Sequence, residues 1–342
     1  MKKSNFKKEG KCFIIAEIGV NHNGDIQLAH KMIDSAKKCG ADAVKFQTFT
    51  AEKLVSPTTP KVSYQKITTT PNESHFDMIK KLELSFDHHH ILKKYCNSQN
   101  IEFLSTPYDI ESAKFLHEKL DVNFFKTASA DIVDIPLQSY ISGTGKHSFV
   151  SVGMATMSEV HEVVKIYKKN NLTLMHCVSN YPCKDQSLNM NVLSTLKNTF
   201  DISIGYSDHS IGNDAALLSI ALGSCVVEKH FTLDKDLSGP DHRASSDPIE
   251  FSDLVNIIRK GEKILGNSTK KIQPEEEEMR LVSRKSLTLS NSLKAGDKIR
   301  ESDLILKRPG TGLMYSEFNN LLGRVVNRNL SKDYQIQFDD LK

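Results

Sequence analysis

Two histidines in the second half of the chain could hold one metal ion between them. His209 follows the short apolar run 202–205, and His230 follows the run 225–227. If these runs are neighbouring parallel strands, both imidazoles lie at the carboxyl end of one sheet, where α/β proteins bind metals and substrates. An isolated histidine pair is more often structural, but matching positions in consecutive strand–loop units favour a metal site. Two imidazoles without thiolates suit a divalent ion such as manganese, iron, cobalt or zinc.

Two lysines interrupt apolar runs and therefore predict buried ammonium groups. Lys45 lies within 43–46 (AVKF), and Lys126 lies within 124–127 (FFKT). A buried ammonium is costly unless an anion offsets its charge. The pattern leaves open a structural ion pair, for instance with Glu17, or an anionic substrate such as a phosphate or carboxylate. A Schiff-base lysine is a third interpretation, because desolvation lowers the pKa of a lysine and frees a nucleophilic amine.

Polar residues recur at the carboxyl ends of the expected strands. A lone serine at a strand end is usually a turn or a helix cap, so each residue alone is weak evidence. Their recurrence after most of the strands favours a ligand-binding mouth of a barrel. These residues are Glu17, Lys45, Gln47, Thr106, Lys126, Ser129, Ser151, Ser179, Tyr181, Ser207, His209, Glu228 and His230.

The elements that would position these residues alternate between strand-like runs and amphipathic helical segments. This alternation favours a (β/α)8 TIM barrel. The alternative is a doubly wound open sheet, which is disfavoured because no GxGxxG motif follows any of the runs. The polar stretch 55–75 is expected to be an active-site loop. The expected strands are 13–17, 43–48, 101–106, 123–128, 148–153, 172–177, 201–206 and 224–230.

The pattern changes after residue 266. Residues 267–283 are polar and charged and predict a linker, whereas short alternating runs from 284 to 342 predict a small, mostly β domain. We therefore expect a catalytic barrel at 1–266. The second domain is too small to have more than a marginal core of its own, so we expect it to dock on another surface.

Composition argues for a cytoplasmic protein without nucleic-acid or membrane partners. The net charge is +3 with acids and bases interspersed, which argues against a nucleic-acid surface. The basic N-terminus lacks a hydrophobic signal core, and no apolar stretch is long enough to span a bilayer. The six cysteines show no CxxC spacing and are expected to be reduced. The run His88–His90 lies in a charged helical segment and is expected to be solvated.

The chain contains the segments 13–24 (FIIAEIGVNHNG), 41–48 (ADAVKFQT), 205–209 (GYSDH), 228–232 (EKHFT), 238–242 (SGPDH) and 307–310 (KRPG). The first five resemble signatures of the sialic acid synthase (N-acetylneuraminate synthase) family, in order and at compatible spacing. The last resembles the signature of its C-terminal antifreeze-like (SAF) domain. The likeness covers nearly the whole chain.

The resemblance implies a transferase that condenses phosphoenolpyruvate with an N-acetylated hexose. The products would be a nine-carbon 2-keto sugar acid and phosphate, released by C–O cleavage, and we expect N-acetylmannosamine as the acceptor. One alternative is a legionaminic- or pseudaminic-type synthase that uses a 6-deoxy-diacetamido hexose. A more distant alternative is a Schiff-base lysine aldolase. The resemblance also implies a domain-swapped homodimer, in which Arg308 reaches from one chain's small domain into the barrel of the other.

The same resemblance implies a divalent metal on His209 and His230, where it would polarise the sugar aldehyde. Manganese is the expected ion, with magnesium or cobalt as alternatives. Glu17 would handle protons or position the attacking water. The residues implied to bind phosphoenolpyruvate are Lys126, Thr106, Ser151, Ser179 and Ser207, and those implied to face the sugar are Lys45, Gln47, Tyr181 and Asp241.

One departure from the family pattern bears on the acceptor sugar. The family segment usually reads Lys-Ile-x-Ser-x-Glu, whereas residues 126–131 read Lys-Thr-Ala-Ser-Ala-Asp, with Ser129 retained. The glutamate of the family contacts sugar hydroxyls, so the shorter Asp131 leaves the identity of the sugar open. The position of Ser179 is often Asn or Thr in the family, a milder change that keeps a hydrogen-bonding group.

Overall fold

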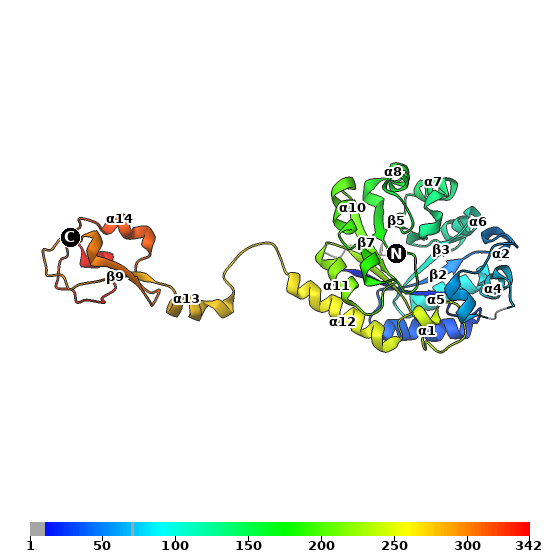
Figure 1. Ribbon diagram of the computed structural model, residues 1–342, viewed down its shortest axis with the longest axis horizontal. Coiled ribbons are helices and arrows are strands. Elements are labelled where there is room, and N and C mark those ends of the chain that lie inside the picture. Colours follow the sequence, from blue (N-terminus) through cyan, green and yellow to red (C-terminus); the bar gives the residue numbers. More distant parts are fainter. Residues whose placement is uncertain (1–10, 70–71) are drawn as a thin grey trace. The chain divides into compact units, whose positions relative to one another are not determined.

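The computed structural model describes residues 11–69 and 72–342 and divides into two compact units, Met1–Gly266 and Asn267–Lys342. In the first unit, helices surround a sheet of eight parallel strands (Figure 1). The strands follow the order β3-β2-β1-β8-β7-β6-β5-β4, and β3 and β4 at the two ends also pack against each other. The predicted TIM barrel is therefore confirmed. Its strands are β1 Phe13–Gly19, β2 Ala43–Thr48, β3 Glu102–Pro107, β4 Phe124–Thr127, β5 His147–Ser151, β6 Leu172–His176, β7 Ser203–Asp208 and β8 Val226–His230.

Helices follow the strands and cover the outside of the barrel. Local capping fixes several of their starts: Asp247 accepts hydrogen bonds from the amides of Ile249 and Glu250 and precedes a proline, which suits the first turn of a helix. The stretch expected as one active-site loop contains the short helix α3. The helices are α1 Ile26–Lys38, α2 Ala51–Leu54, α3 Ser63–Thr68, α4 His75–Lys81, α5 Phe86–Ser98, α6 Ile110–Lys114 (continued by a π-turn, Phe115–Lys119), α7 Ile135–Gly143, α8 Met157–Ile166, α9 Asp185–Leu188, α10 Val192–Phe200, α11 Asp214–Ala221 and α12 Pro248–Leu265.

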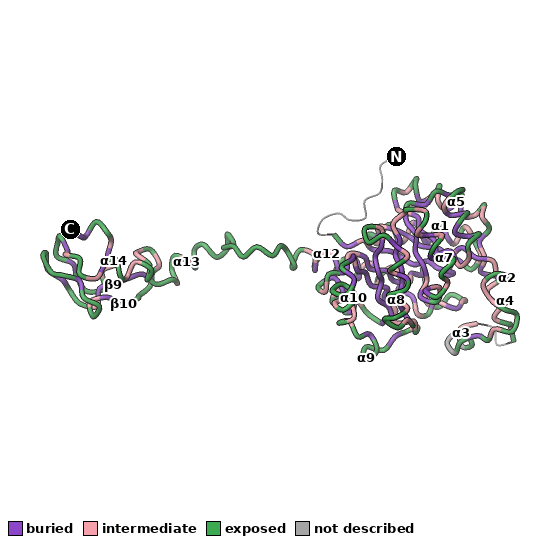
Figure 2. Tube along the Cα trace, turned by 90° about the horizontal axis from the view of Figure 1, so that it is seen from above, coloured by how far each residue is buried: buried purple, intermediate pink, exposed green. Residues whose placement is uncertain are grey.

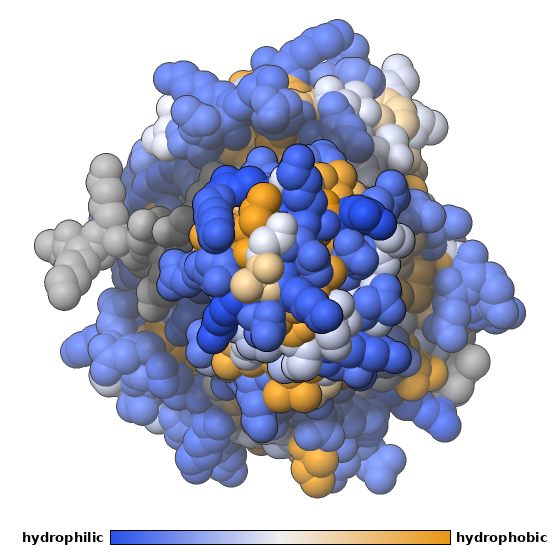
Figure 3. Space-filling view, turned by 90° about the vertical axis from the view of Figure 1, so that its left-hand side faces the viewer, coloured by the Kyte–Doolittle hydropathy of each residue, from blue (hydrophilic) through white to orange (hydrophobic). Residues whose placement is uncertain are grey.

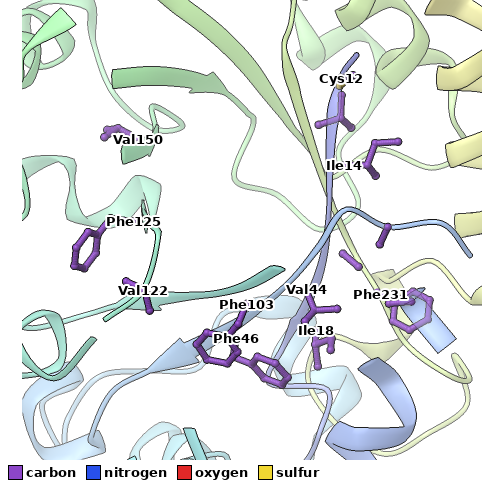
Figure 4. Close-up of a cluster of buried hydrophobic side chains, with 14 of the residues drawn as sticks. Cys12, Ile14, Ile18, Val44, Phe46, Phe103, Val122, Phe125, Val150 and Phe231 are labelled. Carbon is purple, nitrogen blue, oxygen red and sulfur yellow. The ribbon is translucent and has the colours of Figure 1, made fainter. Parts of the chain in front are cut away.

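The apolar core of the barrel has two layers because strand side chains alternate between the two faces of the sheet. One layer fills the space between strands and helices, and it includes Ile14, Val44, Phe46 and Phe103 (Figure 4). Buried residues accordingly concentrate on the strands, whereas the outer helix faces are exposed (Figure 2). The second layer closes the inside of the barrel, and it consists of Ile15, Ala43, Leu104, Phe124, Phe149, Met175 and Val226.

The histidine run on α5 differs from its prediction. His89 is fully buried, its Nδ1–H donates to the Ser85 carbonyl at 2.9 Å, and its Nε2 accepts from the Thr48 hydroxyl at 2.9 Å. Its ring packs against Phe103 and Phe115. The expectation of a solvated run is wrong at this position, because α5 turns this face toward β2 and β3.

The second unit has a small core of its own. The antiparallel strands β9 Ser286–Leu289 and β10 Leu304–Lys307 form its sheet, with the helices α13 Glu277–Ser283 and α14 Phe318–Leu321. Leu287, Leu289 and Ile336 are among its buried residues. The face of the protein drawn in Figure 3 is mostly hydrophilic with scattered apolar residues. The segment expected as a linker includes α13. Among the described helices, none has the length and apolar character needed to cross a bilayer.

Candidate active site

A polar layer lies directly above the apolar layer inside the barrel. The residue two positions after each member of the apolar layer points inward again, and each of these residues is buried. Most were predicted as strand-end candidates. Glu228 had been noted only as a polar strand end without a role, and Cys177 only as a reduced thiol. The polar layer consists of Glu17, Lys45, Thr106, Lys126, Ser151, Cys177 and Glu228.

Lys45 bridges the two carboxylates of this layer. Its Nζ lies 2.9 Å from Glu17 Oε2 and 3.6 Å from Glu228 Oε1, and it donates to Thr106 Oγ1 at 3.0 Å. Gln47 in turn donates to Glu17 Oε1 at 3.1 Å. The structural ion pair with Glu17 considered from the sequence is therefore present, but it belongs to a larger cluster of charges.

Lys126 lies on the other side of Glu228. Its Nζ donates to Ser151 Oγ at 2.6 Å and to the Thr127 carbonyl at 3.0 Å, and it lies 3.7 Å from Glu228 Oε1. Ser207 also donates to Glu228 Oε1, at 3.1 Å, whereas the buried Oε2 of Glu228 has no hydrogen-bond partner. Glu228 is thus the charge that links both lysines, with one oxygen left for another group.

The two carboxylates of the layer differ in their pKa. Burial raises the pKa of Glu17 to about 7, against the attraction of Lys45. Burial also acts to raise the pKa of Glu228, but Lys126 and Lys45 outweigh it and hold that pKa below its ordinary value. Burial lowers the pKa of Lys126. A carboxyl that titrates near neutrality beside one that stays ionised suits an acid–base role for Glu17.

A tight pocket of small side chains lies beyond β5. Ser129 Oγ accepts from the Gly153 amide at 3.0 Å and lies 3.0 Å from Cys177 Sγ. An ideal Cβ placed on Gly153 would lie 2.5 Å from Ser179 Oγ. Ser129, Cys177 and Ser179 therefore surround a backbone position that has no room for a side chain. Gly153 was not recognised from the sequence, because a single glycine after a strand usually indicates only a turn.

The two histidines face each other, with ring centroids 5.6 Å apart. The ring of Tyr181 lies 4.1 Å from that of His209 and 5.3 Å from that of His230. His209 Nδ1 donates to the Val178 carbonyl at 2.8 Å, so its Nε2 is unprotonated and can accept or ligate. This Nε2 lies 3.5 Å from Ser207 Oγ. Burial lowers the pKa of His209 to about 4 and that of His230 well below its usual value, so both rings are neutral.

These features fit a divalent ion. Neutral imidazoles are the ligand form of histidine, and a carbonyl partner on the second ring nitrogen is the usual way to orient it. The buried Nδ1 of His230 has no hydrogen-bond partner. No cluster of three or more histidine, cysteine or carboxylate side chains suited to hold an ion occurs in the described ranges, so the protein would supply two ligands and leave the other positions open.

Two further candidates lie on loops, and one lies in the other unit. Asp131 is part of the 3₁₀ turn Ser129–Val133, its buried Oδ2 has no hydrogen-bond partner, and burial raises its pKa to about 7. Asp241 lies on the loop after β8, immediately before the 3₁₀ turn His242–Ala244. Arg308 is exposed on the second unit, so the barrel's own residues form the cluster described above without it.

Comparison with known proteins places both units in described families. The model of the NeuB family matches residues 32–270, and the SAF domain model matches residues 284–342. N,N'-diacetyllegionaminic acid synthase of Legionella pneumophila is 44% identical over 94% of this chain and 92% of that protein. The enzyme of the same name from Campylobacter jejuni is 40% identical over 96% of this chain and 99% of that protein.

A solved structure agrees with the fold. The N-acetylneuraminic acid (sialic acid) synthetase of Leptospira borgpetersenii, solved in complex with citrate, superposes with a TM-score of 0.70 and is 35% identical. The match covers 79% of this chain and 90% of that chain. The relatives named for legionaminic acid are thus more similar in sequence than the structural neighbour named for N-acetylneuraminic acid.

Proposed function

The chain belongs to the NeuB family and carries a C-terminal SAF domain, and we propose that it condenses phosphoenolpyruvate with a 6-deoxy-diacetamido hexose to give a legionaminic-type sugar acid. It is an enzyme of the sugar-acid synthase class. The observation that carries the choice of acceptor is the 44% identity to a diacetyllegionaminic acid synthase over nearly the full length of both chains. N-acetylmannosamine, the acceptor expected from the sequence, becomes the second candidate.

The polar layer supports an anionic substrate such as phosphoenolpyruvate. An ammonium has three N–H donors, and Lys126 uses two of them on Ser151 and Thr127. Glu228 Oε1, at 3.7 Å, is too far for a hydrogen bond to the third. A phosphate or carboxylate oxygen would take that donor. Thr106 and Ser179 add neutral hydroxyl donors, which hold an anion without the desolvation penalty of further charges. Ser207, proposed for the same ligand, would turn its hydroxyl from Glu228 toward the anion.

The reaction forms one carbon–carbon bond and exchanges one carbon–oxygen bond at C2. C3 of phosphoenolpyruvate bonds to the aldehyde carbon of the open-chain sugar, water adds at C2, and phosphate leaves with the bridging oxygen. The new alkoxide must gain a proton, and the attacking water must lose two, the second as phosphate leaves and the C2 carbonyl forms. Glu17, whose pKa is raised to about 7 by burial, can hold or release a proton at neutral pH, so we assign it the proton transfer.

A divalent ion on His209 and His230 would polarise the aldehyde as a Lewis acid. Manganese is the first candidate, with magnesium and cobalt as alternatives. Tyr181 packs against both imidazole rings, edge-on to that of His230, and would keep bulk water from that side of the site. Asp131, Asp241, Lys45 and Gln47 are proposed to face the sugar. Asp131 is shorter than the glutamate common in the family, which suits an acceptor that fills the pocket differently from N-acetylmannosamine.

We further propose a cytoplasmic homodimer in which the partner's Arg308 completes the sugar site. The second unit exposes apolar side chains that a second chain could cover: Met279, Leu281 and Val282 on α13 are 62%, 55% and 58% exposed. Apolar residues grouped on one short helix are typical of an interface.

Phosphate release measured with phosphoenolpyruvate and each acceptor tests the proposal. The expected result is a kcat/KM at least about tenfold higher for the diacetamido hexose than for N-acetylmannosamine, since contacts to one extra polar group discriminate by that factor or more. A preference for N-acetylmannosamine would overturn the choice of acceptor. Borohydride trapping with pyruvate is the control for the aldolase mechanism, because a covalent adduct on Lys126 would contradict the synthase.

A further inference from the structure

Behind the two histidines lies a buried ion pair that has no part in the chemistry proposed above. Lys229 Nζ lies 2.6 Å from Asp208 Oδ2, and their side chains are 6% and 0% exposed. Asp208 and Lys229 occupy paired positions of β7 and β8, and each directly precedes one histidine in the sequence. Because neighbouring strand residues point to opposite faces, the ion pair lies on the outer face of the sheet when the histidines face inward.

The ion pair also fixes the loop that follows β7. Besides Asp208, the Lys229 ammonium donates to the carbonyls of Ser210 and Gly212, each at 2.9 Å, so all three of its donors are used. Asp208 Oδ1 accepts from the Ser210 amide at 2.9 Å and from its hydroxyl at 2.6 Å. The residues before and after His209 are therefore bound to the same group, the ammonium of Lys229 on β8.

Other hydrogen bonds connect His209 to a different part of the barrel. Its carbonyl accepts from the Cys183 amide at 2.8 Å, and its ring donates to the Val178 carbonyl at 2.8 Å. These bonds hold His209 to the segment after β6. The contacts of Lys229, in contrast, connect the loop around His209 to the strand that carries His230.

We propose that Asp208 and Lys229 are a positioning pair, which sets the separation of His209 and His230 and with it the affinity of the site for its divalent ion. The inference rests on the metal role given in the proposed function. Burying two charges costs desolvation energy, and an apolar pair of the same volume would often stabilise the fold equally well. What an apolar pair would lack is the directional bonding that fixes two adjacent backbones to each other.

The test uses a double variant, Asp208→Asn with Lys229→Met, which removes both charges and so leaves no lone buried ion. The control is Asp42→Asn with Arg259→Met, since these side chains form another ion pair with a 2.6 Å contact, between the start of β2 and α12. Mn²⁺ affinity is measured by calorimetry on metal-free full-length protein. The ligand field is read from the visible absorption of bound Co²⁺, and stability from thermal unfolding without metal.

We expect the Asp208/Lys229 double variant to bind Mn²⁺ about 10- to 100-fold more weakly, the usual effect of losing outer-shell support, with a changed Co²⁺ spectrum. The Asp42/Arg259 control should keep wild-type affinity whatever its stability. A second variant, Lys229→Arg, keeps the charge but presents a planar fork to three acceptors, so it should weaken binding by about threefold or more even if the double variant does not fold.

The outcomes distinguish a failure of the positioning role from the absence of the metal site itself. Wild-type affinity and an unchanged Co²⁺ spectrum in the folded variants would overturn the positioning role and leave the metal site intact. A wild-type protein that binds neither ion would overturn the metal site and the positioning pair together.

Discussion

Replacement of Gly153 by alanine should impair the pocket that we propose to bind phosphoenolpyruvate. The added Cβ would lie 2.5 Å from Ser179 Oγ and 2.8 Å from both Cys177 Sγ and Ser129 Oγ, far inside ordinary contact distance. The backbone of Gly153 is not in the left-handed region, so lack of space and not backbone strain is the cause. The barrel can accommodate the methyl group only by turning these side chains away.

The size of the effect follows from the groups displaced. Overpacking of this kind forces side chains from their preferred rotamers and shifts the backbone, at a cost of about 1–3 kcal/mol. Rotation of the Ser129 and Ser179 hydroxyls would relieve the strain but remove the two neutral hydrogen bonds that they are proposed to make to the substrate, each worth about 1 kcal/mol. A loss of about 2 kcal/mol in transition-state binding corresponds to a kcat/KM about 30-fold lower.

The assay is phosphate release at varied phosphoenolpyruvate concentration, together with thermal unfolding. Gly143→Ala is the matched control, because a Cβ there meets nothing within 4 Å. Gly143 ends α7, so alanine there should leave activity unchanged and stabilise the fold by up to about 1 kcal/mol. A Gly153→Ala enzyme with wild-type kcat and KM for phosphoenolpyruvate would refute the reasoning, since the pocket would then tolerate the methyl group or not touch the substrate.

Three further outcomes are expected. Burial raises the pKa of Asp131 from 3.8 to about 7. The wild-type free energy of unfolding should therefore fall relative to that of Asp131→Asn as the pH rises through this window, by at most about 4 kcal/mol. Parallel pH profiles of the two proteins in urea unfolding would contradict this. Chelation should abolish phosphate release and Mn²⁺ should restore it, whereas full activity in metal-free enzyme would argue against a catalytic ion. Mixing inactive Arg308→Ala and Glu17→Ala chains should recover part of the activity in heterodimers, and no recovery in purified heterodimers would count against the swap.

The barrel could be predicted from the sequence because its strands are short apolar runs at regular spacing. Each predicted strand lies within about two residues of the observed one at both ends, since side-chain alternation and flanking loops are local properties. Several site residues could be predicted for a related reason, because a polar residue that interrupts an apolar strand must meet a polar partner or a ligand. These residues are Glu17, Lys45, Lys126 and Ser151.

The role of Glu228 and the importance of Gly153 were missed because both depend on neighbours distant in sequence. Glu228 is one acid among many until the barrel places it between Lys45 and Lys126. Gly153 matters because the segment after β6 and the turn after β4 bring side chains against it. One local signal could have helped: Glu228 lies two residues before His230 and so faces the same side of its strand.

The alternation of strands and helices, the family signatures and the histidine pair can be read without coordinates, because they depend on residue type and short-range spacing. Which charges meet depends on how the chain folds. The fold placed His89 in the core although this residue lies in a polar stretch of the sequence, and it brought Lys229 of β8 to the loop after β7. The physical reason is that a buried charge or imidazole is defined by the partners that replace its water, and in a closed barrel those partners come from other strands.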